Sequence, residues 1–472
     1  MSAHTAPAHR APDAPDAPRE SLPVAIRTLG CKVNRAESEM LAAALLGRGV
    51  ELAEEDMAAV VVVNTCTVTG EADAKARKAV RRALGAARRP VVVVTGCLAA
   101  LDRAGLESLG ERVVVEVDKD ALARRVWTLA GAGEDDVPAR ATSRAGEAFR
   151  TRATLKIEDG CDNFCAYCIV PHARGGPRAT PLDELVARAA SLAEAGVREL
   201  VLTGINLGRY RDGATGADLP TLVGALAATG VERIRLSSIE PPDLTARLLG
   251  VLAETPSACA HVHVPLQSGS DAVLARMRRR YTAEEYAARV EAAREALPGL
   301  ALTTDVLVGF PGETDADAAV TREYCERIGF AKLHVFRYSR RGGTPAAEMP
   351  GQVPAPVSAS RAQALRDLGE ELAARDARDR LGDRAEALIE RITRARGGSP
   401  TRADGTTREY VKVRFEADGF AVGDLVAVEL GERAGARVCA RVVSPAPKGA
   451  RSAPSVVESH GERAAGDTAA SA

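Results

Sequence analysis

Three cysteines stand close together in the middle of the chain, in the segment GCDNFCAYC, as Cys161, Cys165 and Cys168. Three thiolates at this spacing can bind three irons of a [4Fe–4S] cluster and leave the fourth iron without a protein ligand. Ligation by four cysteines suits electron transfer, whereas an open coordination position is what a catalytic metal needs. The spacing therefore indicates a catalytic iron–sulfur cluster.

A zinc site is the alternative for the same cysteines, with His172 as the fourth ligand. Structural zinc prefers paired C-x2–4-C knuckles that close a tetrahedron. The C-x3-C-x2-C spacing fits such a knuckle poorly, so the iron–sulfur interpretation is favoured.

Three further cysteines follow short apolar runs near the N-terminus, and helical segments separate the runs. This alternation predicts a small α/β domain with a parallel sheet. Because the carboxyl ends of parallel strands meet at one edge of a sheet, we expect the three cysteines to converge there. Three separately buried core cysteines are the alternative. The runs are Val24–Leu29 before Cys31, Val60–Val63 before Cys66 and Val91–Val94 before Cys97.

Six β-strand candidates alternate with helical patterns in the central part of the chain and predict a partial (β/α)6 barrel. They are Ala153–Ile157, Glu199–Leu202, Arg233–Ser237, His261–Val264, Leu300–Val308 and Lys332–Phe336. After a predicted helix over Ser360–Leu381, short strands at regular spacing predict a small OB-like β-barrel. These strands are Ala385–Ile392, Glu409–Phe415, Leu425–Leu430 and Arg437–Val443.

The composition is that of a folded protein without a strong charge bias, since the 472 residues carry a net charge of −1. No apolar run is long enough for a membrane span and no secretory signal is present, so we expect a cytoplasmic protein without a membrane partner. The expected organisation is an N-terminal domain over 22–130, a central domain over 147–378 and a C-terminal barrel over 379–445, with disordered tails at 1–21 and 446–472.

The chain resembles the radical S-adenosylmethionine (SAM) superfamily, and more narrowly its methylthiotransferases, over nearly its whole length. The motifs that carry the resemblance are GCKVN, NTC, CDNFCAYCIVPHARG, LTGINLG, SSIEP, HVPLQSGSD and DVLVGFPGET. The resemblance implies a radical SAM [4Fe–4S] cluster on the central triad and a second [4Fe–4S] cluster on Cys31, Cys66 and Cys97. It also implies that the C-terminal barrel is a TRAM domain that binds RNA.

Polar or glycine residues at the ends of the central strands are candidates for contacts to SAM, by the same resemblance. Several of them are equally explained as turn formers. They are Gly204, Asn206, Ser237, Glu240, Gln267, Asp305 and Gly309.

Basic and aromatic side chains are further candidates for ligand or RNA contacts. Arg174 and Arg178 follow the central triad and could bind a carboxylate or a phosphate. The run Arg276–Arg280 is either an RNA contact or a solvated helix face. Tyr410 and Phe415 could stack on bases or pack in the C-terminal barrel.

The GCKVN motif is similar to that of the methylthiotransferase branch acting on N6-threonylcarbamoyladenosine beside the tRNA anticodon. The resemblance thus implies a tRNA anticodon loop and SAM as partners, together with an unidentified low-potential electron donor. Branches acting on isopentenyladenosine in tRNA or on an aspartate of a ribosomal protein are alternatives. A non-catalytic iron–sulfur carrier or RNA-binding scaffold is the alternative outside enzymes.

Overall fold

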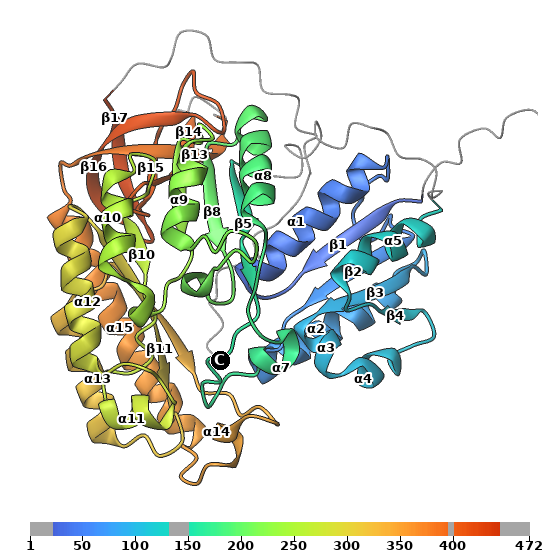
Figure 1. Cartoon of the computed structure of the whole chain (residues 1–472), viewed down its shortest axis with the longest axis horizontal. Coiled ribbons are helices and arrows are strands. Elements are labelled where there is room, and N and C mark those ends of the chain that lie inside the picture. Colours follow the sequence, from blue (N-terminus) through green and yellow to red (C-terminus); the bar gives the residue numbers. More distant parts are fainter. Residues whose placement is uncertain (1–21, 132–150, 395–400, 444–472) are drawn as a thin grey trace, which may run out of the picture.

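Buried valines build the N-terminal sheet in the computed structural model, which describes residues 22–131, 151–394 and 401–443. Four parallel strands lie in the order β1-β2-β3-β4, and Val60–Val63 pair in register with the valines that begin β3 (Figure 1). The strands are β1 (Val24–Thr28), β2 (Val60–Thr65), β3 (Val91–Gly96) and β4 (Val113–Val115), and the helices are α1 (Lys32–Gly47), α2 (Gly70–Leu84), α3 (Cys97–Leu101), α4 (Arg103–Glu107) and α5 (Lys119–Leu129).

The central strands form a partial barrel of two parallel runs, β5-β8-β9 and β10-β11-β12. Backbone hydrogen bonds join the runs, from Cys259 N to Ile234 O at 2.8 Å and from Ile239 N to His263 O at 2.9 Å. All six predicted strands are present, each to within one residue at either end. They are β5 (Arg152–Lys156), β8 (Glu199–Thr203), β9 (Arg233–Leu236), β10 (His261–His263), β11 (Ala301–Val308) and β12 (Lys332–Arg337).

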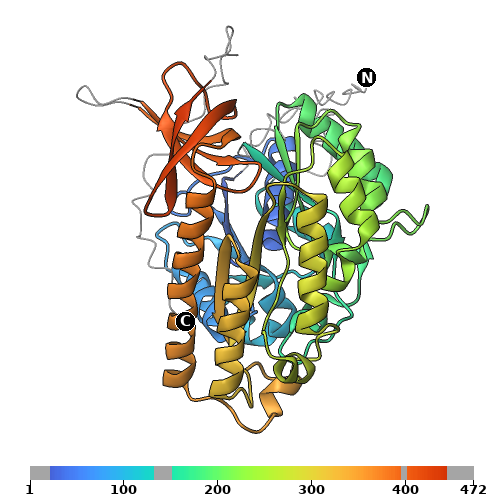
Figure 2. The ribbon, with the colours of Figure 1, turned by 90° about the vertical axis from the view of Figure 1, so that its left-hand side faces the viewer.

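Helices cover the outer face of this barrel, and the long α15 runs along it toward the C-terminal strands (Figure 2). Two helices begin with a capping box, in which Thr282 or Thr314 exchanges hydrogen bonds with the acidic residue three positions on. The helices are α7 (Val170–Arg174), α8 (Leu182–Glu194), α9 (Leu219–Ala227), α10 (Ala246–Glu254), α11 (Asp271–Arg276), α12 (Ala283–Ala296), α13 (Asp315–Ile328), α14 (Pro345–Glu348) and α15 (Ala355–Asp379), with 3-10 turns η1 (Leu207–Arg209) and η2 (Pro241–Asp243) and a short hairpin of β6 (Glu158–Asp159) and β7 (Arg178–Ala179).

The C-terminal strands close into a five-stranded barrel in the order β13-β14-β15-β17-β16, as the OB-like prediction required. Its core holds Val413, Phe415 and Val428, which are almost fully buried. The strands are β13 (Arg384–Thr393), β14 (Arg402–Thr407), β15 (Lys412–Glu416), β16 (Leu425–Ala434) and β17 (Arg437–Val442).

This C-terminal barrel sits against the amino ends of the central strands. Arg233, the first residue of β9, is fully buried and donates Nη1 to the backbone oxygen of Thr406 at 3.1 Å. Arg152, which begins β5, pairs with Glu390 at 2.8 Å. Since these residues begin their strands, the C-terminal barrel lies at the opposite end from the loops that follow the strands.

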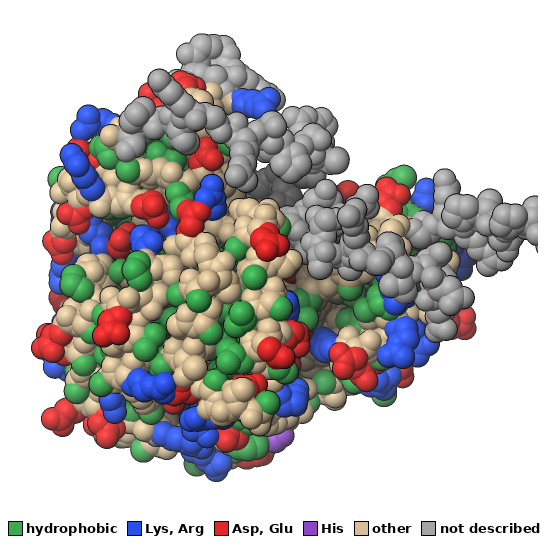
Figure 3. Space-filling model, turned by 45° about the horizontal axis from the view of Figure 1, so that its top comes forward, with side chains coloured by type: hydrophobic (Ala, Val, Ile, Leu, Met, Phe, Trp, Pro, Cys, Tyr) green, Lys and Arg blue, Asp and Glu red, His purple; other side chains and the backbone are tan. Residues whose placement is uncertain are grey.

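The surface carries both signs of charge. On the face shown in Figure 3, Lys and Arg side chains are interspersed with Asp and Glu and do not form one basic field. Within the described ranges, no helix combines the length and apolarity needed to cross a bilayer.

Candidate active site with two cysteine triads

The central triad lies in the loop that follows β5 and β6. Gly160 precedes the first cysteine with φ +83°, and a Cβ there would overlap the backbone oxygen of Gly176. Cys161 N donates to Gly175 O at 2.9 Å. Only glycine fits the point where this loop folds back against the segment after α7.

The three thiols of the loop lie close enough for the charges of Cys161 and Cys165 to act on Cys168. Burial is the main cause that raises the pKa of Cys168, to about 12. Such a thiol keeps its proton at neutral pH until a metal replaces it, as metal binding to cysteine requires. Arg279 Nη1 donates to Cys165 Sγ at 3.3 Å and also pairs with Glu240.

The N-terminal cysteines also come together, at the carboxyl edge of the parallel sheet. Cys31 is the N-cap of α1, Cys66 follows β2, and Cys97 begins α3. Gly30, with φ +99°, lies so close to Cys66 that a Cβ would overlap the Cys66 Cβ. The charges of both other cysteines act on Cys66, whose pKa burial raises to about 11. Cys66 and Cys97 are buried, whereas Cys31 is exposed.

A three-thiol set of this kind fits an iron–sulfur cluster better than a single zinc ion. Among the described residues, no three His, Cys, Asp or Glu side chains converge as ligands of one metal ion would. His172, the proposed fourth zinc ligand, is exposed and packs edge-on against Phe164. The glycines at these turns, Gly30 beside Cys66 and Gly160 before Cys161, let the backbone approach more closely than any side chain would allow.

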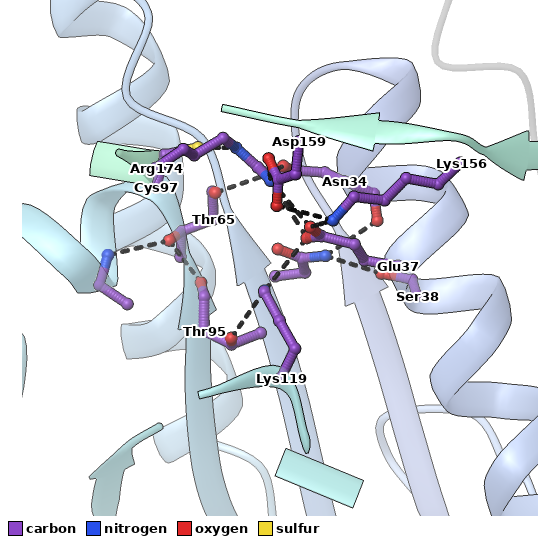
Figure 4. A network of polar contacts seen from close by, with 12 residues as sticks. Asn34, Glu37, Ser38, Thr65, Thr95, Cys97, Lys119, Lys156, Asp159 and Arg174 are labelled. Carbon is purple, nitrogen blue, oxygen red and sulfur yellow. Dashed lines mark hydrogen bonds and ion pairs between the residues drawn. The ribbon is translucent and has the colours of Figure 1, made fainter. Parts of the chain in front are cut away.

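Arg174 connects the segment that follows the central triad to the N-terminal triad. It ends α7, a few residues after the central triad, and its side chain is 5% exposed. Its Nε donates to Cys97 Sγ at 3.2 Å, and its Nη1 donates to Glu37 of α1 at 2.8 Å (Figure 4). The expectation that Arg174 binds a ligand carboxylate or a phosphate does not match these contacts.

Unpaired polar atoms mark a second feature next to the central loop. Glu158 Oε1 and both side-chain polar atoms of Asn206 are buried without a hydrogen-bond partner. Gly204 faces the same carboxylate, since a Cβ there would lie 2.9 Å from Glu158 Oε2. Buried groups of this kind need a partner, and a bound polar ligand would supply it.

Other candidate SAM residues lie at the carboxyl ends of their strands. Glu240 follows β9 and faces Arg279, beside Cys165. Ser237 is buried, with Oγ 3.5 Å from Thr203 Oγ1.

Two further candidates, Gln267 and Asp305, lie beside β11 or within it. Gln267 has φ +64° and bridges β11 through a hydrogen bond from its N to Asp305 O at 2.9 Å. Asp305 lies inside β11, not at its end, and its carboxylate is 3.3 Å from His263 Nε2.

Gly309 follows β11 with φ +75° and packs against α15, where a Cβ would lie 2.5 Å from Ser358 Cβ. Its N–H donates to Glu313 at 2.6 Å. These contacts match the turn-forming alternative for this residue.

Single cysteines and aromatic residues complete the assignment of candidates. Cys259 and Cys325 are buried in the protein core, whereas Cys439 is exposed on β17. Phe415 is in the core of the C-terminal barrel, and Tyr410 packs on His261 with ring centroids 4.5 Å apart. Both aromatic rings therefore pack against other parts of the protein, as the packing alternative for these residues expected.

Two functional candidates were not singled out from the sequence. Arg279 belongs to the basic run Arg276–Arg280, yet its side chain is buried and contacts Cys165, and the residue before it, Arg278, has φ +58°. Glu158 carries no motif of its own. The position of two adjacent acids directly after a strand was the available signal.

Comparisons with known proteins identify the family of the chain. The Radical SAM superfamily matches residues 155–325, and Uncharacterized protein family UPF0004 matches residues 23–117. The threonylcarbamoyladenosine tRNA methylthiotransferase MtaB of Bacillus subtilis (strain 168) is 38% identical over 424 residues, which are 86% of this chain and 93% of that protein. The chain belongs to the radical SAM tRNA methylthiotransferases.

Members named for another tRNA nucleoside are also similar to this methylthiotransferase. The tRNA-2-methylthio-N(6)-dimethylallyladenosine synthase of Acidothermus cellulolyticus is 34% identical over 454 residues, covering 92% of this chain and 90% of that protein. The solved structure of the radical SAM methyltransferase TsrM from Kitasatospora setae shares the fold, with a TM-score of 0.50 and 15% identity over 73% of this chain and 84% of that chain.

Family membership makes the chain an enzyme that uses SAM and an iron–sulfur cluster in the methylthiolation of tRNA. The alternative of a non-catalytic carrier or scaffold was therefore wrong.

Proposed function

We propose that this methylthiotransferase modifies carbon 2 of N6-threonylcarbamoyladenosine next to the anticodon of tRNA, with sulfur from a second [4Fe–4S] cluster. The observation that carries the proposal is the pairing of two three-cysteine sites, one on each parallel sheet, through the Arg174–Cys97 contact at 3.2 Å. One site can then activate the substrate carbon while the other holds the sulfur within reach of it.

The central triad holds the radical SAM cluster in this proposal, and the N-terminal triad holds the second one. When bound, the central cluster and SAM supply the radical that activates the substrate C–H bond. The protein contributes thiolate ligands and fixed polar groups. Glu158 and Asn206, whose buried atoms lack partners, would orient the polar end of SAM, and Glu240 would do so from the neighbouring strand.

The remaining strand-end candidates would take part to different degrees. Ser237, Gln267 and Asp305 lie on or shortly after the central strands and remain proposed SAM or substrate contacts. Gly204 would allow the backbone to pass close to Glu158, and Gly309 would allow the turn after β11 to pack against α15.

A cationic cavity supports the threonylcarbamoyl branch. A cavity of about 650 Å³ between β1 and α1 is lined by Cys31, by the cations Lys32 and Arg35, and by Glu39, which pairs with Arg35 at 2.9 Å. Desolvation and then the charges of Arg152 and Arg235 lower the pKa of Lys32, and these two arginine charges would favour an anionic group there. The threonyl group carries a carboxylate that this amine can pair with, whereas a dimethylallyl group is uncharged.

Nucleoside mass spectrometry of total tRNA, from cells with and without the gene, tests the substrate. We expect loss of the 2-methylthio form of threonylcarbamoyladenosine and accumulation of its unmodified precursor. Loss of 2-methylthio-isopentenyladenosine instead would move the enzyme to the other tRNA branch. An unchanged tRNA profile would contradict the proposal and direct the search to the ribosomal protein.

The roles of the two triads are tested with purified, reconstituted enzyme, reductant and SAM. Cys165→Ala should abolish formation of 5′-deoxyadenosine. Cys66→Ala should retain it while losing methylthiolated product. Product formation by Cys66→Ala would contradict the second cluster. A low-potential electron donor, still to be identified, is required in the cell.

A further inference from the structure

Arg174 uses every N–H group of its guanidinium. Its Nε donates to Cys97 Sγ at 3.2 Å, and its Nη1 donates to Glu37 Oε1 at 2.8 Å and Asp159 Oδ1 at 2.9 Å. Its Nη2 donates to Asn34 Oδ1 at 2.7 Å and to Glu37 Oε2 at 3.4 Å. A side chain with all five donors engaged is fixed in one orientation, and a lysine could not reproduce this fork.

The acceptors of Arg174 are themselves held in place (Figure 4). Lys156 Nζ bridges Glu37 at 2.7 Å and Asp159 at 2.8 Å, and Lys119 Nζ lies 3.1 Å from Glu37. These three cations face two carboxylates, and the exposed Arg178 is a fourth cation, 3.7 Å from Asp159. The remaining positive charge is matched if the neighbouring sulfur is an anionic thiolate ligand.

Asn34 extends the connection to the other loops of the N-terminal triad. Its Nδ2 donates to the backbone oxygens of Leu29 and Thr65, both at 2.8 Å. Leu29 and Thr65 lie just before Cys31 and Cys66. The residue that accepts from Arg174 therefore also joins the two other cysteine loops.

We propose that Arg174 is a positioning residue that fixes the Cys97 sulfur and raises the reduction potential of the cluster on the N-terminal triad. This inference rests on the second cluster of the proposed function. An N–H···S bond from a cationic group favours the reduced cluster, which carries the additional negative charge. Arg279 makes the corresponding contact to Cys165 of the central triad at 3.3 Å.

The test isolates the N-terminal cluster in the full-length protein. The parent is a variant with Cys161→Ala, Cys165→Ala and Cys168→Ala, reconstituted with iron and sulfide. Iron content is measured first, and the midpoint potential is then measured by anaerobic titration followed by electron paramagnetic resonance. Arg174→Gln and Arg174→Lys are compared with Arg178→Gln, an exposed arginine of the same segment that lies 3.7 Å from Asp159.

We expect the Arg174→Gln cluster to have a more negative midpoint potential than the parent. Arg174→Lys keeps the charge but not the fork, so its potential should lie between the two, and Arg178→Gln should match the parent. A loaded Arg174→Gln cluster with the parent's potential overturns the inference. If Arg174→Gln binds no iron, the midpoint potential of the Arg174→Lys cluster is the deciding measurement. A potential equal to that of the parent in this variant also overturns the inference. An iron-free parent would instead refute the second cluster, and the inference with it.

Discussion

Glu158 Oε2 accepts the backbone N–H of Asn206 at 2.9 Å, although the two residues are 48 positions apart in the sequence. The same oxygen accepts from Ile205 N at 3.0 Å. This carboxylate therefore ties the strand leading to the central triad to the loop after β8. Its other oxygen, Oε1, is buried and has no hydrogen-bond partner, so the stability of the protein should depend on whether Glu158 is protonated.

Burial is the main cause that raises the pKa of Glu158, to about 7 from an ordinary value of 4.5. The folded protein then binds the proton more tightly than the unfolded chain, so stability falls as the pH rises from about 4.5 through 7. The size of this loss is on the order of 3 kcal/mol.

Glu158→Gln removes the titrating group and should gain stability relative to the parent between about pH 5 and about pH 8. Thermal unfolding of the variant and of the parent at both pH values measures this gain in stability. Glu194→Gln, at an exposed position in α8, should show no such pH-dependent difference. An equal melting difference at both pH values for Glu158→Gln would contradict the prediction.

Lys32→Gln should weaken methylthiolation of threonylcarbamoyladenosine-containing tRNA about 10- to 100-fold in kcat/KM, since a charge-assisted hydrogen bond contributes about 1.5–3 kcal/mol. Formation of 5′-deoxyadenosine in the absence of tRNA should persist. Lys32→Arg, which keeps the charge, should retain more activity. Equal kcat/KM for the Gln variant and the parent would argue against carboxylate recognition at this position.

Gly30→Ala should prevent loading of the N-terminal triad. The substitution places a Cβ on the Cys66 Cβ and forces alanine to adopt φ +99°. We expect iron content to fall by half while SAM cleavage remains. Gly224→Ala in α9, where the added Cβ meets open space, serves as the control and should add about 0.5–1 kcal/mol of stability. Full iron content in Gly30→Ala would show that the loop can shift.

Arg233→Ala should loosen the C-terminal barrel from the central one. The substitution leaves Glu199, which is also fully buried, short of one of its cations and removes the hydrogen bond to Thr406. Loss of one partner of a buried pair costs about 3–5 kcal/mol. Calorimetry should show a melting temperature lowered by several degrees. Arg198→Ala, from an exposed pair with Glu232, should cost less than about 1 kcal/mol.

The strands of the barrel could be predicted because β-branched runs end at glycine or polar residues, and all six appear within one residue of the prediction. β14 was missed because its sequence, RADGTT, has no apolar alternation and reads as a turn. The helical segment that follows β3 is broken at Asp102, whose carboxylate caps a new helix, α4, through Gly105 N.

The cysteines of the site could be predicted from their spacing, whereas the contacts between the two triads could not. Arg174 and Cys97 are 77 positions apart, and their contact depends on how two sheets dock. The predicted tails, 1–21 and 446–472, lie outside the described residues, and the domain limits remain predictions. The RNA role of the C-terminal barrel also remains a prediction.

The placement of the C-terminal barrel sets a minimum size for any RNA that it helps to bind. That barrel contacts the residues that begin the central strands, such as Arg233, while both triads follow strand ends. The eight residues of β11 (Ala301–Val308) extend over about 26 Å at ~3.3 Å per residue. A free nucleoside can occupy only one end of this span. An RNA that touches both ends must therefore be long enough to span the whole side of the barrel, which excludes a free nucleoside or a dinucleotide as such a ligand.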